Sequence, residues 1–372
     1  MEDSDSGISN NCIHSLKLKC PDIDNDEDSL TKTPRRLTTV NFDTYTCGVA
    51  WSARGNTCAV STETRVHVYD HEEGALRYRD SIRHAECLYS WEWGGGGDCI
   101  LTTGRYQPVH LYRVPDTGGL QLEDTYKCIN HLDELAHAHS VTMDARGEAI
   151  YCGLKSEVRV FDVRRPGRES DSHVTRDTGG GQQGIISCLA TSPTIPVYAA
   201  GSYDRTVGLY TSQGERLCVL RGQQGGLTQL TFSEDGGKLL AGGRKDNEII
   251  CWDLRRPGEV LWTVHRVVTT NQTVAFSLRG RWLVSGNTDG SVRLWDTGAG
   301  HVDPDTSHVV LAPRRGWALH GDAVTGVAWH PAHTDTLATA TGQRHFALES
   351  AEEDEEEMEE NSLVIWDTKN AF

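Results

Sequence analysis

The sequence contains no run of about 18 consecutive apolar residues, the length that a transmembrane helix requires. The acidic start, Met1-Glu-Asp-Ser-Asp, is not followed by the apolar segment of a secretory signal. The 11 cysteines are odd in number and include no Cys-x-x-Cys pair. Cys58, Cys99, Cys152 and Cys251 lie in strand-like runs, where they are interpreted as reduced core residues. We therefore expect an intracellular protein that does not span a membrane.

Motifs of common enzyme sites are also missing. The sequence has no Gly-x-Ser-x-Gly, no phosphate-binding loop and no His-Glu-x-x-His. The run Gly94–Gly97 lacks the Lys-Ser/Thr of a phosphate loop and is interpreted as a hairpin turn. His137 and His139, with His131 nearby, could offer metal ligands, but no Cys or carboxylate stands at ligand spacing. We therefore predict a protein that is not an enzyme and needs no metal or other cofactor.

Positive charge is scarce, because 36 Lys and Arg stand against 53 Asp and Glu, for a net charge of −17. This balance argues against a uniformly basic nucleic-acid coat, although it permits a local basic patch. Acidic residues are concentrated in two segments, residues 1–34 and the run Glu352–Glu360. Low apolar content in the first and self-repulsion in the second predict a disordered tail over 1–34 and a disordered insert over 347–361.

A repeat of just over forty residues organises the rest of the chain. Phe232 and Phe276 are 44 residues apart, and Trp252 and Trp295 are 43 apart. Each copy contains three short β-type segments and a closing Trp-Asp, which is typical of a β-propeller blade of the WD-repeat kind. Such a unit cannot bury both faces of its sheet alone and must stack on neighbours in a ring.

The closing strand of each repeat carries an aromatic residue. These residues are Tyr69, Tyr112, Phe161, Tyr210, Trp252, Trp295 and Trp366. We therefore predict an all-β fold, a seven-bladed WD-repeat β-propeller over residues 35–372. Because the chain ends soon after Asp367, a segment from elsewhere must complete the last blade, and Leu37–Val40 is the β-prone candidate.

Two further recurring sets of residues are assigned structural roles. Aromatic residues early in the repeats are predicted to pack between blades. These are Trp51, Trp93, Phe232, Phe276 and Trp329. Asp204, Asp246 and Asp289 recur just before the closing strand, where paired carboxylates could indicate acid–base chemistry, but the repeated position favours hydrogen bonds that fix turns.

The loops between the second and third strands of the blades emerge on one rim of the ring. Six of the seven loops carry Lys or Arg, and Asn287-Thr288-Asp289 is the exception. A basic face on an acidic protein is the electrostatic footprint of a polyanion site. The predicted RNA-binding residues, here called the basic rim, are Arg65, Arg105, Lys155, Arg205, Arg244, Lys245 and Arg344 for phosphates or bases, and Tyr106, Tyr203 and His345 for stacking on unpaired bases.

Two other interpretations of the basic rim stay open. Charged residues make up 24% of the chain, so a cation in an exposed turn is common. Propeller rims also bind proteins, and the chain could be a protein-interaction scaffold without specific RNA recognition, its rim holding an acidic peptide. Such a scaffold would bind RNA weakly and without sequence preference.

From about Asn130 to Arg344 the chain resembles the telomerase Cajal-body WD-repeat protein family. A general WD repeat would share only the Trp-Asp and Gly positions, whereas these matches are longer. They include Asn130-His-Leu-Asp-Glu-Leu, Gly184-Ile-Ile-Ser-Cys188, Arg244-Lys-Asp, Cys251-Trp-Asp-Leu-Arg255, Thr269-Thr-Asn-Gln272 and Ala338-Thr-Ala-Thr-Gly-Gln-Arg344. The first two blades match less clearly.

The resemblance implies a non-enzymatic RNA-binding propeller of the nucleus and its Cajal bodies. Its implied ligand is the CAB box, a loop element of small Cajal-body guide RNAs and, in some lineages, of telomerase RNA. Implied partners are the dyskerin-type core proteins of H/ACA ribonucleoproteins. Because strand pairing between residues near 37 and 363 makes folding slow, a chaperonin is also expected as a folding partner.

Overall fold

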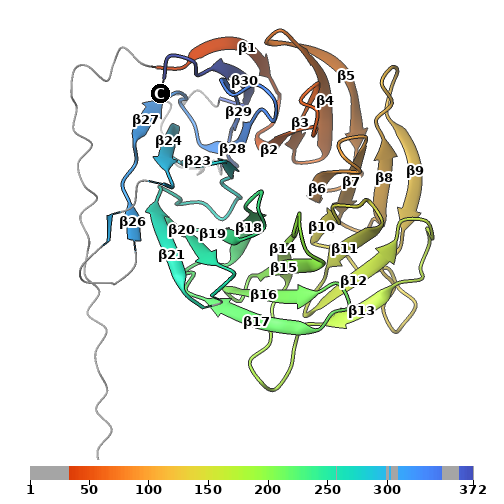
Figure 1. Ribbon diagram of the computed structural model, residues 1–372. Coiled ribbons are helices and arrows are strands. Elements are labelled where there is room, and N and C mark those ends of the chain that lie inside the picture. Colours follow the sequence, from red (N-terminus) through yellow and green to blue (C-terminus); the bar gives the residue numbers. More distant parts are fainter. Residues whose placement is uncertain (1–32, 257, 299–300, 303–308, 346–359, 372) are drawn as a thin grey trace, which may run out of the picture.

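The chain folds as a ring of seven β-sheets, one per predicted blade (Figure 1). The computed structural model describes residues 33–256, 258–298, 301–302, 309–345 and 360–371. The prediction of a seven-bladed propeller is confirmed. In this part of the chain, no helix has the length and apolar character needed to cross a bilayer. The predicted tail, except residues 33–34, and the predicted insert, except residues 360–361, lie outside the described residues.

Blades 1 to 6 follow one another along the chain, and in each the four main strands run in sequence order from the ring axis outward. Blade 1 consists of β2 (Thr46–Trp51), β3 (Thr57–Thr62), β4 (Arg65–Glu72) and β5 (Ala75–Arg83). Blade 2 consists of β6 (Leu88–Gly94), β7 (Cys99–Gly104), β8 (Val109–Arg113) and β9 (Gln121–Tyr126). Blade 3 consists of β10 (Ser140–Met143), β11 (Ala149–Gly153), β12 (Glu157–Asp162) and β13 (Asp171–Val174).

Blades 4 to 7 complete the ring. Blade 4 consists of β14 (Ile186–Thr191), β15 (Val197–Ser202), β16 (Thr206–Thr211) and β17 (Arg216–Arg221). Blade 5 consists of β18 (Leu227–Phe232), β19 (Lys238–Gly243), β20 (Glu248–Asp253) and β21 (Val260–His265), extended by β26 (Val309–Leu311) and β25 (His301–Val302). Blade 6 consists of β22 (Phe276–Arg279), β23 (Trp282–Gly286), β24 (Ser291–Asp296) and β27 (Arg315–Ala318). Blade 7 consists of β28 (Val324–Trp329), β29 (Thr336–Thr341), β30 (Ser362–Asp367) and β1 (Arg35–Asn41).

Each of the first six blades has a fourth, outer strand that the sequence pattern did not reveal. The strand ending in Trp-Asp is the third, and an outer strand such as β9 or β17 follows it in the first six blades. Except for β21, which β26 covers, the outer strands are exposed along much of their length, as in β9, where Gln121, Leu122 and Glu123 are all exposed. A strand that buries little surface has no regular alternation of apolar and polar residues, so its period is hard to detect.

The predicted closure of the ring by the N-terminal strand is confirmed. β1 pairs antiparallel with β30, with Val40 opposite Leu363. Phe42 N–H also donates to the Asn361 carbonyl oxygen over 2.8 Å. Asn361 and Glu360, which the sequence assigned to the insert, therefore belong to the hydrogen-bonded edge of blade 7.

Blade 5 has an addition at its outer edge that no sequence signal indicated. The chain between β24 and β27 leaves blade 6, and its strand β26 pairs parallel with β21, with Thr263 opposite Val310. Leu311 is buried against this edge. An outer strand otherwise presents unpaired N–H and C=O groups, and β26 covers those of blade 5.

The core consists of seven apolar clusters, and each joins two neighbouring blades. The third-strand aromatic residues sit in these clusters, and Trp252, Trp295 and Phe161 are among the largest fully buried side chains. The early aromatic residues also lie between blades, as predicted. For example, the Trp51 indole N–H donates to the Ala328 carbonyl oxygen of blade 7 over 3.2 Å. Stability therefore depends on contacts between blades, which fits the expectation for a stacked repeat.

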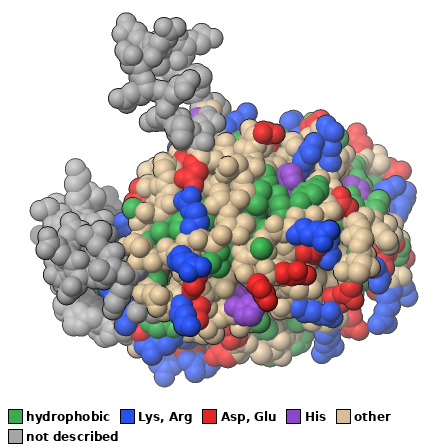
Figure 2. All heavy atoms as spheres, turned by 90° about the horizontal axis from the view of Figure 1, so that it is seen from above, with side chains coloured by type: hydrophobic (Ala, Val, Ile, Leu, Met, Phe, Trp, Pro, Cys, Tyr) green, Lys and Arg blue, Asp and Glu red, His purple; other side chains and the backbone are tan. Residues whose placement is uncertain are grey.

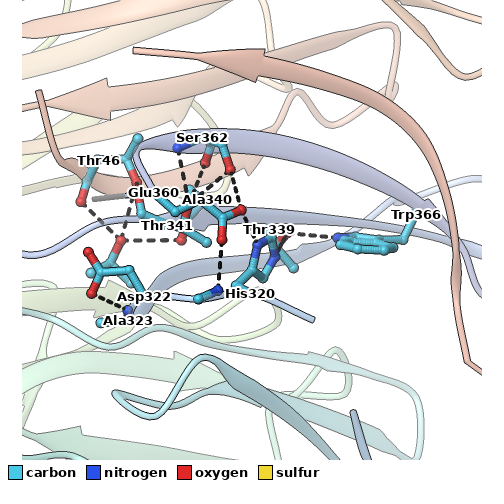
Figure 3. A network of polar contacts seen from close by, with 12 residues as sticks. Thr46, His320, Asp322, Ala323, Thr339, Ala340, Thr341, Glu360, Ser362 and Trp366 are labelled. Carbon is cyan, nitrogen blue, oxygen red and sulfur yellow. Dashed lines mark hydrogen bonds and ion pairs between the residues drawn. The ribbon is translucent and has the colours of Figure 1, made fainter. Parts of the chain in front are cut away.

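Polar side chains lock blade 7 and its contact with blade 1 (Figure 3). His320 hydrogen-bonds the Glu360 Oε1 over 2.8 Å and the Thr339 hydroxyl over 2.9 Å. The Trp366 indole N–H donates to the same hydroxyl over 2.8 Å. Thr46 of blade 1 donates to the Thr341 carbonyl oxygen over 2.8 Å. Despite partial burial, which raises it, the pKa of the Glu360 carboxyl is lowered by hydrogen bonds from His320, the Gly321 N–H and Ser362, so the group stays ionised at neutral pH.

Candidate nucleic-acid interface

The loops that carry the basic rim form one hydrogen-bonded layer with the loops that connect successive blades. Arg105 N–H donates to the Cys87 carbonyl oxygen over 3.0 Å, and Arg244 N–H donates to that of Gly226 over 2.9 Å. The same pairing recurs in blade 7. We call this layer the loop face. It consists of the second-to-third-strand loops and the connecting loops.

The loop face contains most of the strained backbone in the described residues. Six non-glycine residues in the described part of the chain have positive φ, and four of them lie in second-to-third-strand loops. These are Tyr106, Ser156, Arg205 and Lys245, with φ between 47° and 69°. A non-glycine residue in the left-handed region costs about 1–2 kcal/mol, and such strain tends to gather at functional sites. Three of the four belong to the basic rim.

Blades 4 and 5 contribute the tightest cluster of basic-rim residues. The Arg244 guanidinium lies 4.1 Å from the centre of the Tyr203 ring, whose side chain is 38% exposed. A Cβ on Gly226 would approach the Tyr203 ring to 3.1 Å, so only glycine lets the connecting loop pass this closely. The exposed Lys245 follows Arg244, and its N–H donates to the Thr270 carbonyl oxygen over 3.0 Å. Two cations and a ring are therefore held together on one rigid surface.

The buried Arg266 hydrogen-bonds the backbone of the loops next to this cluster. Arg266 is 2% exposed and donates to the carbonyl oxygens of Val274 over 2.6 Å and Gly243 over 3.4 Å. It thereby ties the loop of Arg244 to the connecting loop of blade 6. Burial lowers the pKa of Arg266 to about 10, so the guanidinium remains charged at neutral pH.

Blade 2 presents a second aromatic and basic pair. The Arg105 guanidinium lies 5.0 Å from the centre of the Tyr106 ring, which is 59% exposed. The Tyr106 ring meets the His137 ring edge-on at 4.8 Å, and Tyr106 N–H donates to His137 Nδ1 over 3.3 Å. Arg105 also forms an exposed ion pair with Glu86 over 3.7 Å. An incoming phosphate would therefore compete with a carboxylate at this position.

The remaining basic-rim residues are placed less favourably for contact with RNA. In blade 7, His345 Nε2 lies 3.0 Å from a carboxylate oxygen of the buried Asp322, and Arg344 N–H donates to the Gln272 side chain over 3.0 Å. A histidine engaged by Asp322 has less freedom to stack on a base. Lys155 and Arg205 are exposed on separate loops of blades 3 and 4, and Arg65 is exposed as the first residue of β4 in blade 1, not in the loop where the sequence placed it.

The recurring aspartates have the turn-fixing role that the sequence predicted. Asp204 accepts from the N–H groups of Gln183 over 2.8 Å and Gly184 over 3.1 Å. Asp246 accepts from those of Gln224 over 2.9 Å and Gly225 over 3.0 Å. Each carboxylate thus ties the loop that enters a blade to the second-to-third-strand loop of that blade. These hydrogen bonds lower the pKa of Asp204 despite its partial burial.

Replacement of Asp246 by alanine is expected to lower the free energy of unfolding by about 2 kcal/mol, because three backbone N–H groups lose their acceptor. Asp289→Ala is the matched control, since the exposed Asp289 accepts only from Ser291 among the described residues. Its expected cost is below about 1 kcal/mol. Urea unfolding followed by tryptophan fluorescence measures both, and equal losses would contradict the assigned role.

The three candidate metal-ligating histidines are engaged in different ways. His137 contacts Tyr106, and the His139 ring stacks on the Tyr89 ring at 5.1 Å. His131 is exposed in a tight turn of the same connecting loop. Within the described ranges, no three His, Cys, Asp or Glu side chains are arranged to hold a metal ion. The nine described cysteines are free thiols, as the sequence predicted.

Sequence reasoning missed several residues of the loop face. Tyr89 and Glu92 on the inner strand β6 line a cavity next to the loop face, and Gln272 holds the Arg344 backbone. Glu92 did give a signal, because a carboxyl group between Trp91 and Trp93 is unusual in an inner strand.

Away from the loop face, acidic and basic side chains alternate on the edge of the ring near β1 and β5 (Figure 2). The cations on that edge are therefore not separated from acidic neighbours.

Comparison with known proteins agrees with the repeat pattern. The family described as WD domain, G-beta repeat matches residues 214–253 and 262–296. Telomerase Cajal body protein 1 of Mus musculus is 43% identical over 263 residues, which cover 70% of this chain and 48% of that protein. Its Drosophila melanogaster homolog is 31% identical over 330 residues, covering 84% of this chain and 53% of that protein.

A more distant relative is the Guanine nucleotide-binding protein negative regulator 1 of Schizosaccharomyces pombe. It is 29% identical over 234 residues, which cover 56% of this chain and 57% of that protein. The chain spans about half the length of the curated relatives it matches. With its WD repeats and seven blades, and with 42–43% identity to mammalian relatives over most of its length, this chain belongs to the Telomerase Cajal body protein 1 family of WD-repeat proteins.

Proposed function

We propose that the loop face binds single-stranded loop RNA, and that the RNA is the CAB box of small Cajal-body guide RNAs and of telomerase RNA where it has one. The chain would act without catalysis, as a scaffold that helps these ribonucleoproteins reach Cajal bodies in the nucleus. Its protein partners would be the dyskerin-type core proteins of H/ACA particles, with a chaperonin assisting folding. The names of the relatives refer to telomerase and to the Cajal body, and they support this choice of particle.

The observation that carries the proposal is the cluster of Tyr203, Arg244 and Lys245. One face of the Arg244 guanidinium covers the Tyr203 ring, which leaves its N–H groups available for phosphate oxygens. Among the described residues, neither Arg244 nor Lys245 forms an ion pair with a carboxylate. Unpaired bases can stack on aromatic rings or guanidinium planes, which favours loop RNA over a duplex. A surface of this kind is prepared for a phosphate and an adjacent unstacked base.

The test is sequencing of RNA crosslinked to the full chain and to the double variant Arg244→Glu/Lys245→Glu. The wild type is expected to enrich guide-RNA loops, and the variant is expected to lose that enrichment. In binding titrations the variant should bind the enriched loops at least tenfold more weakly, with a salt slope about 0.7 units flatter for each lost phosphate contact. Loss of these contacts changes affinity because counterion release contributes much of the binding free energy.

The matched control is Arg255→Glu/Arg256→Glu, which makes the same change in charge. Both residues are exposed in the loop between β20 and β21, outside the loop face. The control should enrich the same loops as the wild type. Equal enrichment by all three proteins, or none by the wild type, would instead favour the alternative of a protein-interaction scaffold.

A further inference from the structure

A cavity of about 380 Å³ lies at the centre of the loop face. Its wall includes first or second residues of inner strands, among them Cys47 of β2, Ser140 of β10 and Thr228 of β18. These strand ends directly follow the loops that connect the blades, so the cavity opens towards the loop face. Its volume is within the range of about 300–1,000 Å³ that small ligands occupy.

Aromatic rings stand at the mouth of the cavity. The Tyr89 side chain is 37% exposed, and its ring stacks on that of His139 at 5.1 Å with an angle of 23° between the planes. Burial lowers the pKa of His139, so its imidazole is uncharged at neutral pH, and the stacked rings present a flat surface. Tyr203 also lines the cavity, and through it the Arg244 cluster is continuous with the mouth.

The cavity wall is rich in hydrogen-bond acceptors. Ser140 donates its hydroxyl proton to the Ile186 carbonyl oxygen over 2.9 Å, and Ser187 donates to that of Leu227 over 2.6 Å. Thr228 donates to the Gly242 carbonyl oxygen over 3.3 Å. Because each hydroxyl has committed its proton, only the lone pairs of its oxygen remain for a ligand. The wall therefore favours a ligand that brings N–H donors.

Glu92 supplies the carboxyl group of the cavity wall. Its Oε1 accepts from the Thr142 hydroxyl over 3.0 Å, which is the one hydrogen bond of this side chain among the described residues. The carboxyl is surrounded by protein but keeps contact with the cavity. Burial raises the pKa of Glu92 to about 8, so at neutral pH the group is mostly protonated and repels a phosphate backbone little.

We infer that this cavity holds one unstacked base of the bound RNA, stacked on Tyr89 and presenting an exocyclic amino group to Glu92. The inference rests on the proposed RNA function and adds a base-reading subsite to it. Adenine, cytosine and guanine carry such an amino group, and a carboxyl oxygen can accept from it. In uracil a carbonyl oxygen replaces this amino group, and it would face Glu92 Oε1, the oxygen of the protonated carboxyl that accepts from the Thr142 hydroxyl. The site therefore selects against uracil at one position of the loop.

The test uses fluorescein-labelled single-stranded oligo-A, oligo-C and oligo-U of equal length with the full chain. The wild type is expected to bind oligo-A and oligo-C about tenfold more tightly than oligo-U, because stacking and base-edge contacts each contribute about 1–3 kcal/mol. Tyr89→Ala and Glu92→Leu should each reduce this ratio to about threefold or less. Equal affinity of the wild type for all three RNAs, or an unchanged ratio in both variants, would overturn the inference.

Three further proteins separate the possible causes. Tyr78→Ala removes an exposed tyrosine ring on the outer strand β5, away from the cavity, and should keep the wild-type ratio. Glu92→Gln keeps an acceptor oxygen for the amino group and should keep most of the preference. Because the Tyr89 ring is exposed, Tyr89→Ala should fold even if Glu92→Leu does not, and thermal melts check both. Arg244→Glu/Lys245→Glu should weaken all three RNAs and leave the ratio intact, so unchanged affinities in that variant would count against the proposed function rather than against the cavity.

Discussion

Deletion of residues 1–41, which removes β1, is expected to abolish the cooperative folding of the propeller, whereas deletion of residues 1–32 is expected to leave it unchanged. β1 is the outer strand of blade 7 and pairs with β30 from Arg35 to Asn41. It also contacts blade 1, because the Thr38 hydroxyl donates to the Gly74 carbonyl oxygen over 2.7 Å. Its loss would open the ring at one interface.

The expected effect is large because β1 completes both a sheet and a core. Leu37 and Val40 pack on the cluster between blades 7 and 1, which contains the fully buried Leu363 and Ile365. Without β1, the N–H and C=O groups of β30 would form an exposed, apolar sheet edge, which is a template for aggregation. Each fully buried aliphatic side chain that becomes exposed costs about 1.5–3 kcal/mol, a large part of the 5–15 kcal/mol by which proteins are stable.

Urea unfolding by circular dichroism, together with size-exclusion chromatography, measures this result. The shorter deletion is the matched control, because it leaves all of β1 in place. A peptide of residues 33–42 added in trans should partly restore the melting transition of the longer deletion, since it supplies the missing strand. A monomeric Δ1–41 protein with the wild-type midpoint would show that the six other interfaces close the ring without β1.

Acidification from pH 7 to pH 5 is expected to destabilise the wild type by about 2 kcal/mol more than the variant His330→Asn. His330 is 1% exposed and packs against Trp51 at the interface of blades 7 and 1. Its Nε2–H donates to the Gly55 carbonyl oxygen over 2.9 Å, and its Nδ1 accepts from the N–H groups of Ala332 over 3.1 Å and His333 over 2.8 Å. These roles require the neutral ring, since a protonated ring has no acceptor.

The sign of the effect follows from the two pKa values. Burial, reinforced by His333, His71 and Arg279, lowers the pKa of folded His330 to about 4, below the ordinary value of 6.5. Between these values the unfolded chain takes up a proton that the folded chain does not, so stability is lost as the pH falls below about 6.5. Asparagine offers an acceptor and a donor without titrating in this range. The variant is therefore less stable at pH 7 but responds less to acid.

The contributions of other titrating groups to the pH dependence of stability largely cancel when the wild type and His330→Asn are compared. Burial raises the pKa of Glu92 to about 8, which acts in the opposite direction, and it does so in both proteins. His131→Asn is the control, because His131 is exposed, and it should reproduce the wild-type pH dependence. Free energies of unfolding from urea titrations at pH 5, 6 and 7 give the comparison. Parallel pH profiles for the wild type and His330→Asn would rule out this histidine as a source of acid sensitivity.

The sequence by itself determined the repeat, the number of blades and the means of closure. The spacing of Trp252 and Trp295 and the turns fixed by Asp204 and Asp246 are local patterns, because neighbouring strands of a blade are joined by short loops. Each such pattern is set by alternation and turn chemistry within about forty residues, as in residues 227–297. Closure by β1 could also be predicted, since the third strand of the last repeat, which carries Trp366, needs an outer partner and Leu37–Val40 is β-prone.

Only the tertiary structure decided which predicted site residues meet. Arg244 and Tyr203 lie on different blades, and their contact depends on how blades 4 and 5 stack. The same stacking brings Tyr89 of blade 2 to His139, and Glu92 to Thr142 of blade 3. The folding back of β26 onto β21 likewise crosses from one blade to another. Contacts between blades have no fixed spacing along the chain, because the position of each blade depends on the packing of the whole ring.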